Sequence, residues 1–354
     1  MQNQAKFNTQ DSFFAAANGF AGFRSYFPEV FNSKDYAGIF ILKGGPGTGK
    51  SSLLRKLCDF GEKNGFRVKK VLCSSDVYSL DGVILEKNGI RFAAIDGTAP
   101  HTRDTELPGA VDEIINLGDN WDSERLASEK RLIVSLTKKK AQHYKKAYEL
   151  LSYAGKVSAI IDKTEEENID IENIKIGAKS LAEELSPYEA SGEESFMLNE
   201  SFARQGLLRI DAAEENSSRV IRISESGFAA RIYMSKLLSE LRKKAVGLTV
   251  FPGVFEGENV RAILLNTTKT AIVVSDTPTP DIDLQRYVSK PQSTVLLKSL
   301  ENAKDTLLEE SRRYFSFASD LHFELEKIYI SAMNFKENDI FLEKITEKIK
   351  KSVN

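Results

Sequence analysis

The feature that most constrains this chain is the stretch GGPGTGKSS, residues 44–52, which has the spacing G-x-x-x-x-G-K-S/T. An apolar run, residues 38–42, comes before it and is typical of a buried parallel strand. Leu53, Leu54 and Leu57 come after it, in the spacing of a helix that packs on a sheet. A strand, a glycine-rich loop and a helix in this order predict an α/β fold.

The residue types in the loop suit a polyphosphate. Glycines permit positive φ and a close approach of the backbone, and the N–H groups at a helix N-terminus point at anionic oxygens. We expect Lys50 to reach the β- and γ-phosphates and Ser51 to give its hydroxyl to Mg²⁺. A glycine-rich turn with a surface lysine is the alternative. The predicted nucleotide-binding residues are Gly44, Gly45, Pro46, Gly47, Thr48, Gly49, Lys50, Ser51 and Ser52.

Such a site also needs a carboxylate at the end of a neighbouring strand. Asp96 follows the apolar residues 91–95 and is the first candidate, as a Mg²⁺ ligand together with Ser51. Asp76 follows the preceding strand, so the predicted catalytic residues are Lys50, Asp96 and Asp76. Asp81 is expected to open a helix as a cap or to lie on the surface.

Other residues near Asp96 have weaker claims. Gly97 stands where many ATP-hydrolysing proteins have a glutamate, so no general base is evident. Thr98 and His101 are candidate phosphate sensors and Arg103 a candidate for charge stabilisation, although a single histidine beside a proline is more often structural. No N-K-x-D guanine signature occurs, which favours ATP.

The chain repeats a pattern at about the length of a domain. Residues 220–238 show the same strand, loop and helix pattern as residues 39–57, beginning 181 positions later. Further pairs that recur in this order are 11–14 with 194–197, 79–101 with 260–280, and 145–174 with 312–345. The second loop has lost three glycines, with Arg231 in place of Lys50 and Ile232 in place of Ser51. We therefore expect a second half without an ordinary nucleotide site.

The predicted fold is α/β, with two tandem P-loop NTPase-like three-layer domains that have parallel sheets, each with a long helical arm. The first domain is residues 1–187, with an arm at about 122–185, and a polar linker at residues 186–194 follows. The second domain is residues 195–354, with an arm at about 296–354. Long helices are predicted at residues 123–163 and 301–334, and these two helices are expected to pair or to dock an unidentified protein partner.

Composition excludes several classes of protein. A net charge of −2 gives no nucleic-acid signal, and the basic run at Lys138, Lys139 and Lys140 fits a solvated helix face. Two cysteines, Cys58 and Cys73, fit buried thiols in the cytoplasm. No apolar run of membrane-spanning length occurs. The phenylalanine-rich residues 13–31 are expected to pack on the first core.

The chain resembles a family of bacterial tandem P-loop ATP-binding proteins over most of its length. Three phrases show the resemblance: KGGPGTGKSSLL (43–54), CSSDVYSLDGV (73–83) and DGTAPHTRDTELPGAVDEIINLGDNW (96–121). The resemblance implies two P-loop NTPase-like domains and ATP binding, and the altered second loop places a second ATP in doubt.

Three functions remain open. The first is a slow, Mg²⁺-dependent ATPase with one active site in the N-terminal half, whose nucleotide state moves the helical arms. The second is a small-molecule or nucleotide kinase with Asp76 as base. The third is a scaffold that binds nucleotide without turning it over.

Overall fold

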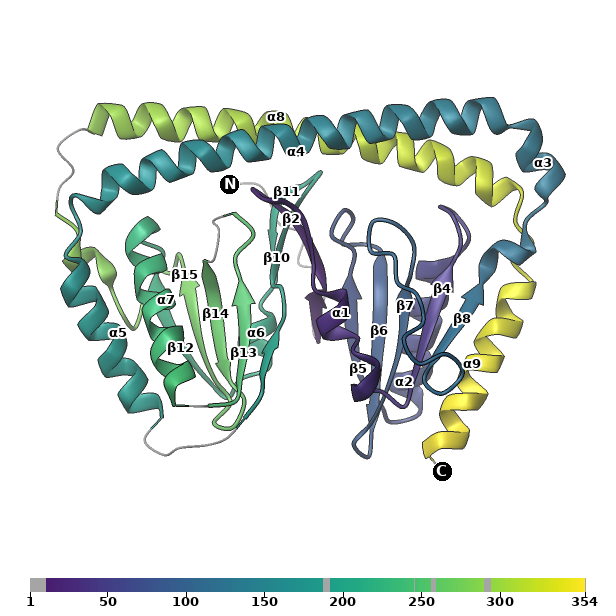
Figure 1. Cartoon of the computed structure of the whole chain (residues 1–354), viewed down its shortest axis with the longest axis horizontal. Coiled ribbons are helices and arrows are strands. Elements are labelled where there is room, and N and C mark those ends of the chain that lie inside the picture. Colours follow the sequence, from purple (N-terminus) through teal and green to yellow (C-terminus); the bar gives the residue numbers. More distant parts are fainter. Residues whose placement is uncertain (1–10, 187–191, 245, 256–258, 290–293, 354) are drawn as a thin grey trace.

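The computed structural model describes residues 11–186, 192–244, 246–255, 259–289 and 294–353. Two α/β halves lie side by side beneath two long helices that run across both of them (Figure 1). The predicted linker, residues 186–194, lies partly outside the described residues.

The first half contains a mixed six-stranded sheet in the order β1-β5-β6-β7-β4-β8. Its strands are β1 (Ser12–Phe14), β4 (Gly38–Lys43), β5 (Arg67–Leu72), β6 (Leu80–Lys87), β7 (Ile90–Asp96) and β8 (Asp112–Asn116). Strand β6 is antiparallel to both of its neighbours, whereas the other pairs are parallel. The predicted all-parallel sheet is therefore wrong at β6. The reason is local, because Asn88 and Gly89 both have positive φ and form a two-residue hairpin turn between β6 and β7.

The second half contains a five-stranded sheet in the order β12-β15-β14-β13-β9. Its strands are β9 (Glu194–Phe196), β12 (Arg219–Ser224), β13 (Leu248–Pro252), β14 (Val260–Leu265) and β15 (Thr270–Ser275). This order, with the same parallel and antiparallel pairs, repeats β4-β7-β6-β5-β1 of the first half. Each half also has a small hairpin: β2 (Ala16–Gly19) with β3 (Gly22–Ser25), and β10 (Glu200–Ala203) with β11 (Gly206–Arg209). The repeated order of blocks predicted from the sequence is thus present in the structure.

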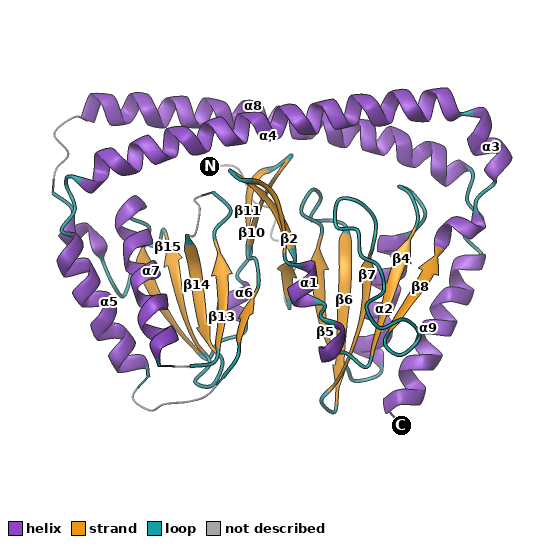
Figure 2. Ribbon diagram, viewed as in Figure 1, coloured by secondary structure: helices purple, strands orange, loops and turns teal. Residues whose placement is uncertain are grey.

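The helices repeat in the same way. They are α1 (Phe27–Val30), α2 (Lys50–Lys63), α3 (Ser123–Ser128), α4 (Lys130–Glu166), α5 (Ile171–Leu185), α6 (Ala212–Glu215), α7 (Gly227–Lys243), α8 (Thr294–Ser331) and α9 (Glu337–Val353), with short 3₁₀ turns η1 (Ser33–Asp35), η2 (Leu117–Asn120) and η3 (Leu284–Tyr287). The two long helices predicted from the sequence are confirmed as α4 and α8. They lie antiparallel against each other (Figure 2), with Ala147 and Leu151 of α4 in one buried cluster with Phe315 of α8.

The two halves exchange their last helices. Helix α5 follows the first sheet in sequence, yet it packs on α7, and Ile174 and Ala178 lie in the core of the second sheet. Helix α9 follows the second sheet, yet it packs on α2, and Ile345 and Ile349 lie in the core of the first sheet. Each sheet is therefore covered partly by a helix of its own half and partly by a helix from the other half of the chain.

The N-terminal segment contributes to the first core, as predicted. Phe13, Phe14, Phe27 and Phe31 are all buried in the cluster that includes both faces of the first sheet. The inner face of the second sheet joins the same cluster through Phe251. Among the described residues, no helix is long and apolar enough to cross a membrane.

Candidate functional site

The glycine-rich loop, defined here as residues 44–51, follows β4, which lies between β7 and the edge strand β8, and leads into α2. Gly47 and Gly49 have φ of 71° and 87°, values that favour glycine strongly. Helix α2 begins at Lys50, directly after Gly49. The N-terminus of α2, with its unpaired N–H groups, therefore opens onto the loop, as the sequence predicts.

The side chain of Lys50 lies across the loop. Its Nζ donates to the carbonyl oxygens of Gly44 and Gly45 at 2.8 and 2.9 Å. The same Nζ is 3.6 Å from Oδ2 of Asp96, and the two side chains are only 11% and 15% exposed. The lysine and the carboxylate that the sequence selected are thus neighbours in a largely buried space.

Strand pairing and a threonine set the position of Asp96. It ends β7, which lies parallel to β4 with Leu42 opposite Asp96. The backbone N–H and the hydroxyl of Thr98 both donate to Oδ1 of Asp96, at 2.8 and 2.5 Å. Thr98 therefore orients the carboxylate and leaves Oδ2 directed toward the lysine.

Ser51 and Asp76 lie on the β6 side of the loop. The hydroxyl oxygen of Ser51 accepts from the backbone N–H of Leu80 at 3.0 Å. Asp76 lies in the turn between β5 and β6, where Oδ1 accepts from the N–H of Tyr78 at 3.1 Å. The described ranges contain no group of three or more His, Cys, Asp or Glu side chains arranged to hold a metal ion.

Helix α8 brings Glu326 and His322 to the loop, which the sequence analysis missed. The backbone of Glu326 packs against Gly47. Burial, followed by the charge of Asp76, raises the pKa of Glu326, while the charge of Lys50 acts to lower it. His322 Nε2 is 3.6 Å from Glu326 Oε1, and burial with nearby lysines lowers the histidine pKa to about 4. A neutral imidazole and a carboxyl group from the second half of the chain therefore face the loop.

The junction of α8 and α9 covers the outside of the loop. A Cβ built on Gly47 would lie 2.7 Å from the backbone oxygen of Glu326, and one on Gly45 would lie 3.3 Å from the ring of Trp121. Asn338 of α9 donates to the carbonyl oxygen of Thr48 at 3.0 Å. No local sequence signal identifies these contacts, because Trp121 is 76 residues from Gly45, and Glu326 and Asn338 are more than 270 residues from the loop.

His101 and Arg103, by contrast, have structural partners. His101 is stacked on Phe27, with centroids 4.6 Å apart, and its Nε2 is 3.3 Å from Oδ2 of Asp81. Arg103 donates to the hydroxyl of Ser33 at 2.9 Å and is buried. The interpretation of Asp81 as a cap or surface residue is wrong: it lies within strand β6 and is 5% exposed, and burial raises its pKa to about 6.

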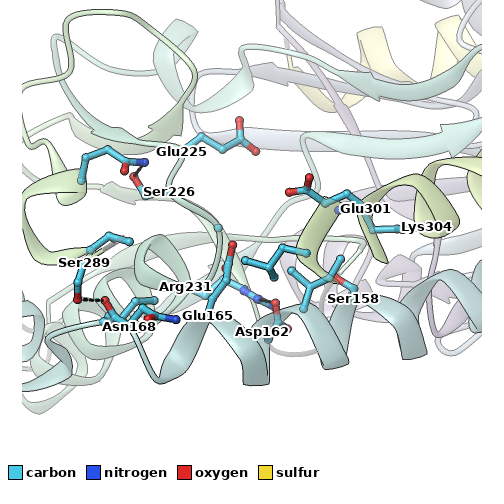
Figure 3. Close-up of a pocket in the computed structure, with 16 residues that line it drawn as sticks. Ser158, Asp162, Glu165, Asn168, Glu225, Ser226, Arg231, Ser289, Glu301 and Lys304 are labelled. Carbon is cyan, nitrogen blue, oxygen red and sulfur yellow. Dashed lines mark hydrogen bonds and ion pairs between the residues drawn. The ribbon is translucent and has the colours of Figure 1, made fainter. Parts of the chain in front are cut away.

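The second loop, defined here as residues 225–232, forms one wall of a pocket of about 350 Å³ (Figure 3). Carboxylates from the end of α4 also line this pocket. Glu165 accepts from the backbone N–H of Phe228 at 3.2 Å, and Asp162 forms an ion pair with Arg231. Glu225 pairs with arginines from two neighbouring elements. Carboxylates of the chain itself therefore already lie at the N-terminus of α7.

Comparisons with protein-family models, with curated proteins and with solved structures find no match for this chain. The glycine-rich loop and its neighbours are therefore the features of the chain that bear on its function.

Proposed function

We propose that the chain is an ATP- and Mg²⁺-binding P-loop NTPase, a slow ATPase with a single active site at the glycine-rich loop. Each half is then a P-loop NTPase-like three-layer unit, in line with the resemblance to bacterial tandem P-loop ATP-binding proteins. The second half, with Arg231 and Ile232 in the positions of Lys50 and Ser51, has a structural or regulatory role.

One observation carries the proposal. The strand, loop and helix unit with the lysine motif has its lysine 3.6 Å from a carboxylate at the end of the adjacent parallel strand. Backbone N–H groups and a lysine bind phosphate oxygens, and a hydroxyl with a carboxylate suits Mg²⁺. In this reading Lys50 binds the β- and γ-phosphates, and Ser51 and Asp96 hold the metal ion or its water.

The test is ADP release from ATP and Mg²⁺ by the whole purified chain. The Lys50→Ala variant should lose turnover, because the lysine contact to the phosphates stabilises the transition state by about 3–4 kcal/mol. Lys63→Ala is the matched control, since Lys63 is an exposed lysine at the other end of the same helix. Equal activity of the Lys50→Ala variant and the wild-type protein would refute the proposal.

A kinase remains the second candidate because the turn that contains Asp76 lies beside the glycine-rich loop: Ser79 N–H is bonded to the carbonyl oxygen of Asp76, and the next residue, Leu80, is bonded to Ser51. An acceptor hydroxyl there would have Asp76 as its base. ADP formation that depends on an added acceptor would favour the kinase, and tight ATP binding without any turnover would favour a scaffold. Both cysteines are free, which fits the proposed cytoplasmic location.

A further inference from the structure

An acidic side chain from a long helix lies at the loop in both halves of the molecule. At the glycine-rich loop it is Glu326 of α8, which packs against Gly47, and at the second loop the acids are Asp162 and Glu165 of α4. Each acid reaches the loop because the long helices cross from one half to the other. The arrangement therefore belongs to the repeated architecture and is not confined to one half.

The repeat makes two of these acids equivalent. Short antiparallel bridges join Trp121 to Met333 and Val288 to Ile169, one beside each loop. Glu326 lies seven residues before Met333, and Asp162 lies seven residues before Ile169.

In the second half, the equivalent acid forms a closed ion pair. Asp162 binds Arg231, the residue in the position of Lys50, and both side chains are less than a fifth exposed. Glu165 adds a hydrogen bond to the first turn of α7. Anions of the chain thus fill this loop in place of phosphate.

In the first half, the equivalent contact is looser. Glu326 lies against the loop, where its backbone oxygen would be 2.7 Å from a Cβ built on Gly47, while Lys50 is held by the carbonyl oxygens of its own loop and by Asp96. The carboxyl side chain is 32% exposed. Lys50 is bound by its own loop and not by Glu326, so the contact between Glu326 and the loop can be broken.

We propose that Glu326 is an internal anion that closes the glycine-rich loop, and that the phosphates of ATP displace it and so release the end of α8. This inference rests on the proposed nucleotide site and assigns its regulation. A carboxylate beside the loop and a phosphate within it are both anions and repel each other, so they compete for the loop. In the second half, the equivalent acid stays ion-paired with Arg231, so the second loop is permanently closed.

A built-in reporter lies at the contact. Trp121 is the single tryptophan of the chain, and its ring lies 5.6 Å from that of Tyr329 on α8 and against Gly45 of the loop. Release of α8 by ATP changes the surroundings of this indole. Titration of the wild-type protein with ATP and Mg²⁺ should therefore change its tryptophan fluorescence, and bound ATP without any such change would overturn the proposal.

The second experiment measures the affinity for ATP and Mg²⁺ by calorimetry. Glu326→Gln should bind about tenfold more tightly than wild type, because a negative charge that repels the phosphates is removed. Glu324→Gln, an exposed glutamate on the same helix, is the matched control and should leave the affinity unchanged. Without nucleotide, the tryptophan spectrum of Glu326→Gln should already resemble that of the ATP-bound wild type.

The outcomes separate this inference from the proposed function. Wild type and Glu326→Gln with equal affinity would overturn the internal anion and leave the nucleotide site standing. Unchanged affinity with lost turnover would make Glu326 a catalytic group, which also overturns it. Binding by the Glu326→Gln variant alone would support the inference in its strongest form, and binding by neither protein would refute the nucleotide site itself.

Discussion

The exchange of helices predicts which half of the molecule a mutation in α9 destabilises. Ile345 of α9 is fully buried and belongs to the core that contains Leu54 and Leu57 of α2. Its position in the sequence is at the end of the second half, yet its packing is in the first. Ile345→Ala should therefore loosen the first sheet and its helix, not the second.

The size of the effect follows from its burial. Truncating a fully buried isoleucine to alanine removes three carbon atoms and leaves a cavity, which costs about 2–5 kcal/mol. Ile340 on the same helix is 56% exposed, so Ile340→Ala should change stability by no more than about 0.5 kcal/mol. Ile345→Ala and Ile340→Ala are the same substitution on the same helix, so they differ only in how deeply the side chain is buried.

Native-state hydrogen exchange read by mass spectrometry locates the loss. Peptides from residues 50–72, which contain α2 and β5, should exchange faster in Ile345→Ala. Peptides from residues 219–252, which contain β12 to β13, should keep their wild-type rates. Faster exchange confined to the second set would refute the reasoning.

Three further predictions concern the loop and its surroundings. Lys50→Ala should abolish ADP formation while Arg231→Ala barely changes it, and equal losses in a turnover assay would contradict a degenerate second loop. Burial raises the pKa of Asp81 from 3.8 to about 6, so the stability it contributes is full below pH 3.8 and is lost as the pH rises through about 6. In Asp81→Asn, the thermal-unfolding temperature should depend less on pH between about 4 and 6 than in the wild type. An unchanged dependence on pH would contradict this role of Asp81. Asn338→Ala removes the hydrogen bond to Thr48 and should cost about 1–3 kcal/mol in chemical denaturation, and no loss would contradict a structural role for that bond.

The sequence predicted those parts of the site that are close together along the chain. The loop, its flanking strand and helix, and the carboxylate of Asp96 follow from local spacing and from the rule that parallel strands end at one edge. The hairpin at Asn88 and Gly89 also had a local signal, since this dipeptide is the strongest short hairpin marker, and the apolar pattern of two strands obscured it.

The remaining parts depend on contacts that no local pattern encodes. Helix α5 has one apolar face that would suit either sheet, so its amphipathic pattern does not select between them. The choice is made by α4, whose 37 residues extend about 55 Å and carry the chain across to the other half. Helix α8 brings Glu326 to the loop in the same way. Because Glu326 is so far from the loop along the chain, no motif spacing predicts this contact.

The exchanged helices also make each half an incomplete folding unit. A fragment that ends at residue 187 would carry α5 without the sheet it covers, and its own sheet would lack α9. A fragment that starts at residue 192 would have the converse defects. Two such fragments, produced together in one cell, should assemble into a split protein, since each supplies the helix that the other is missing.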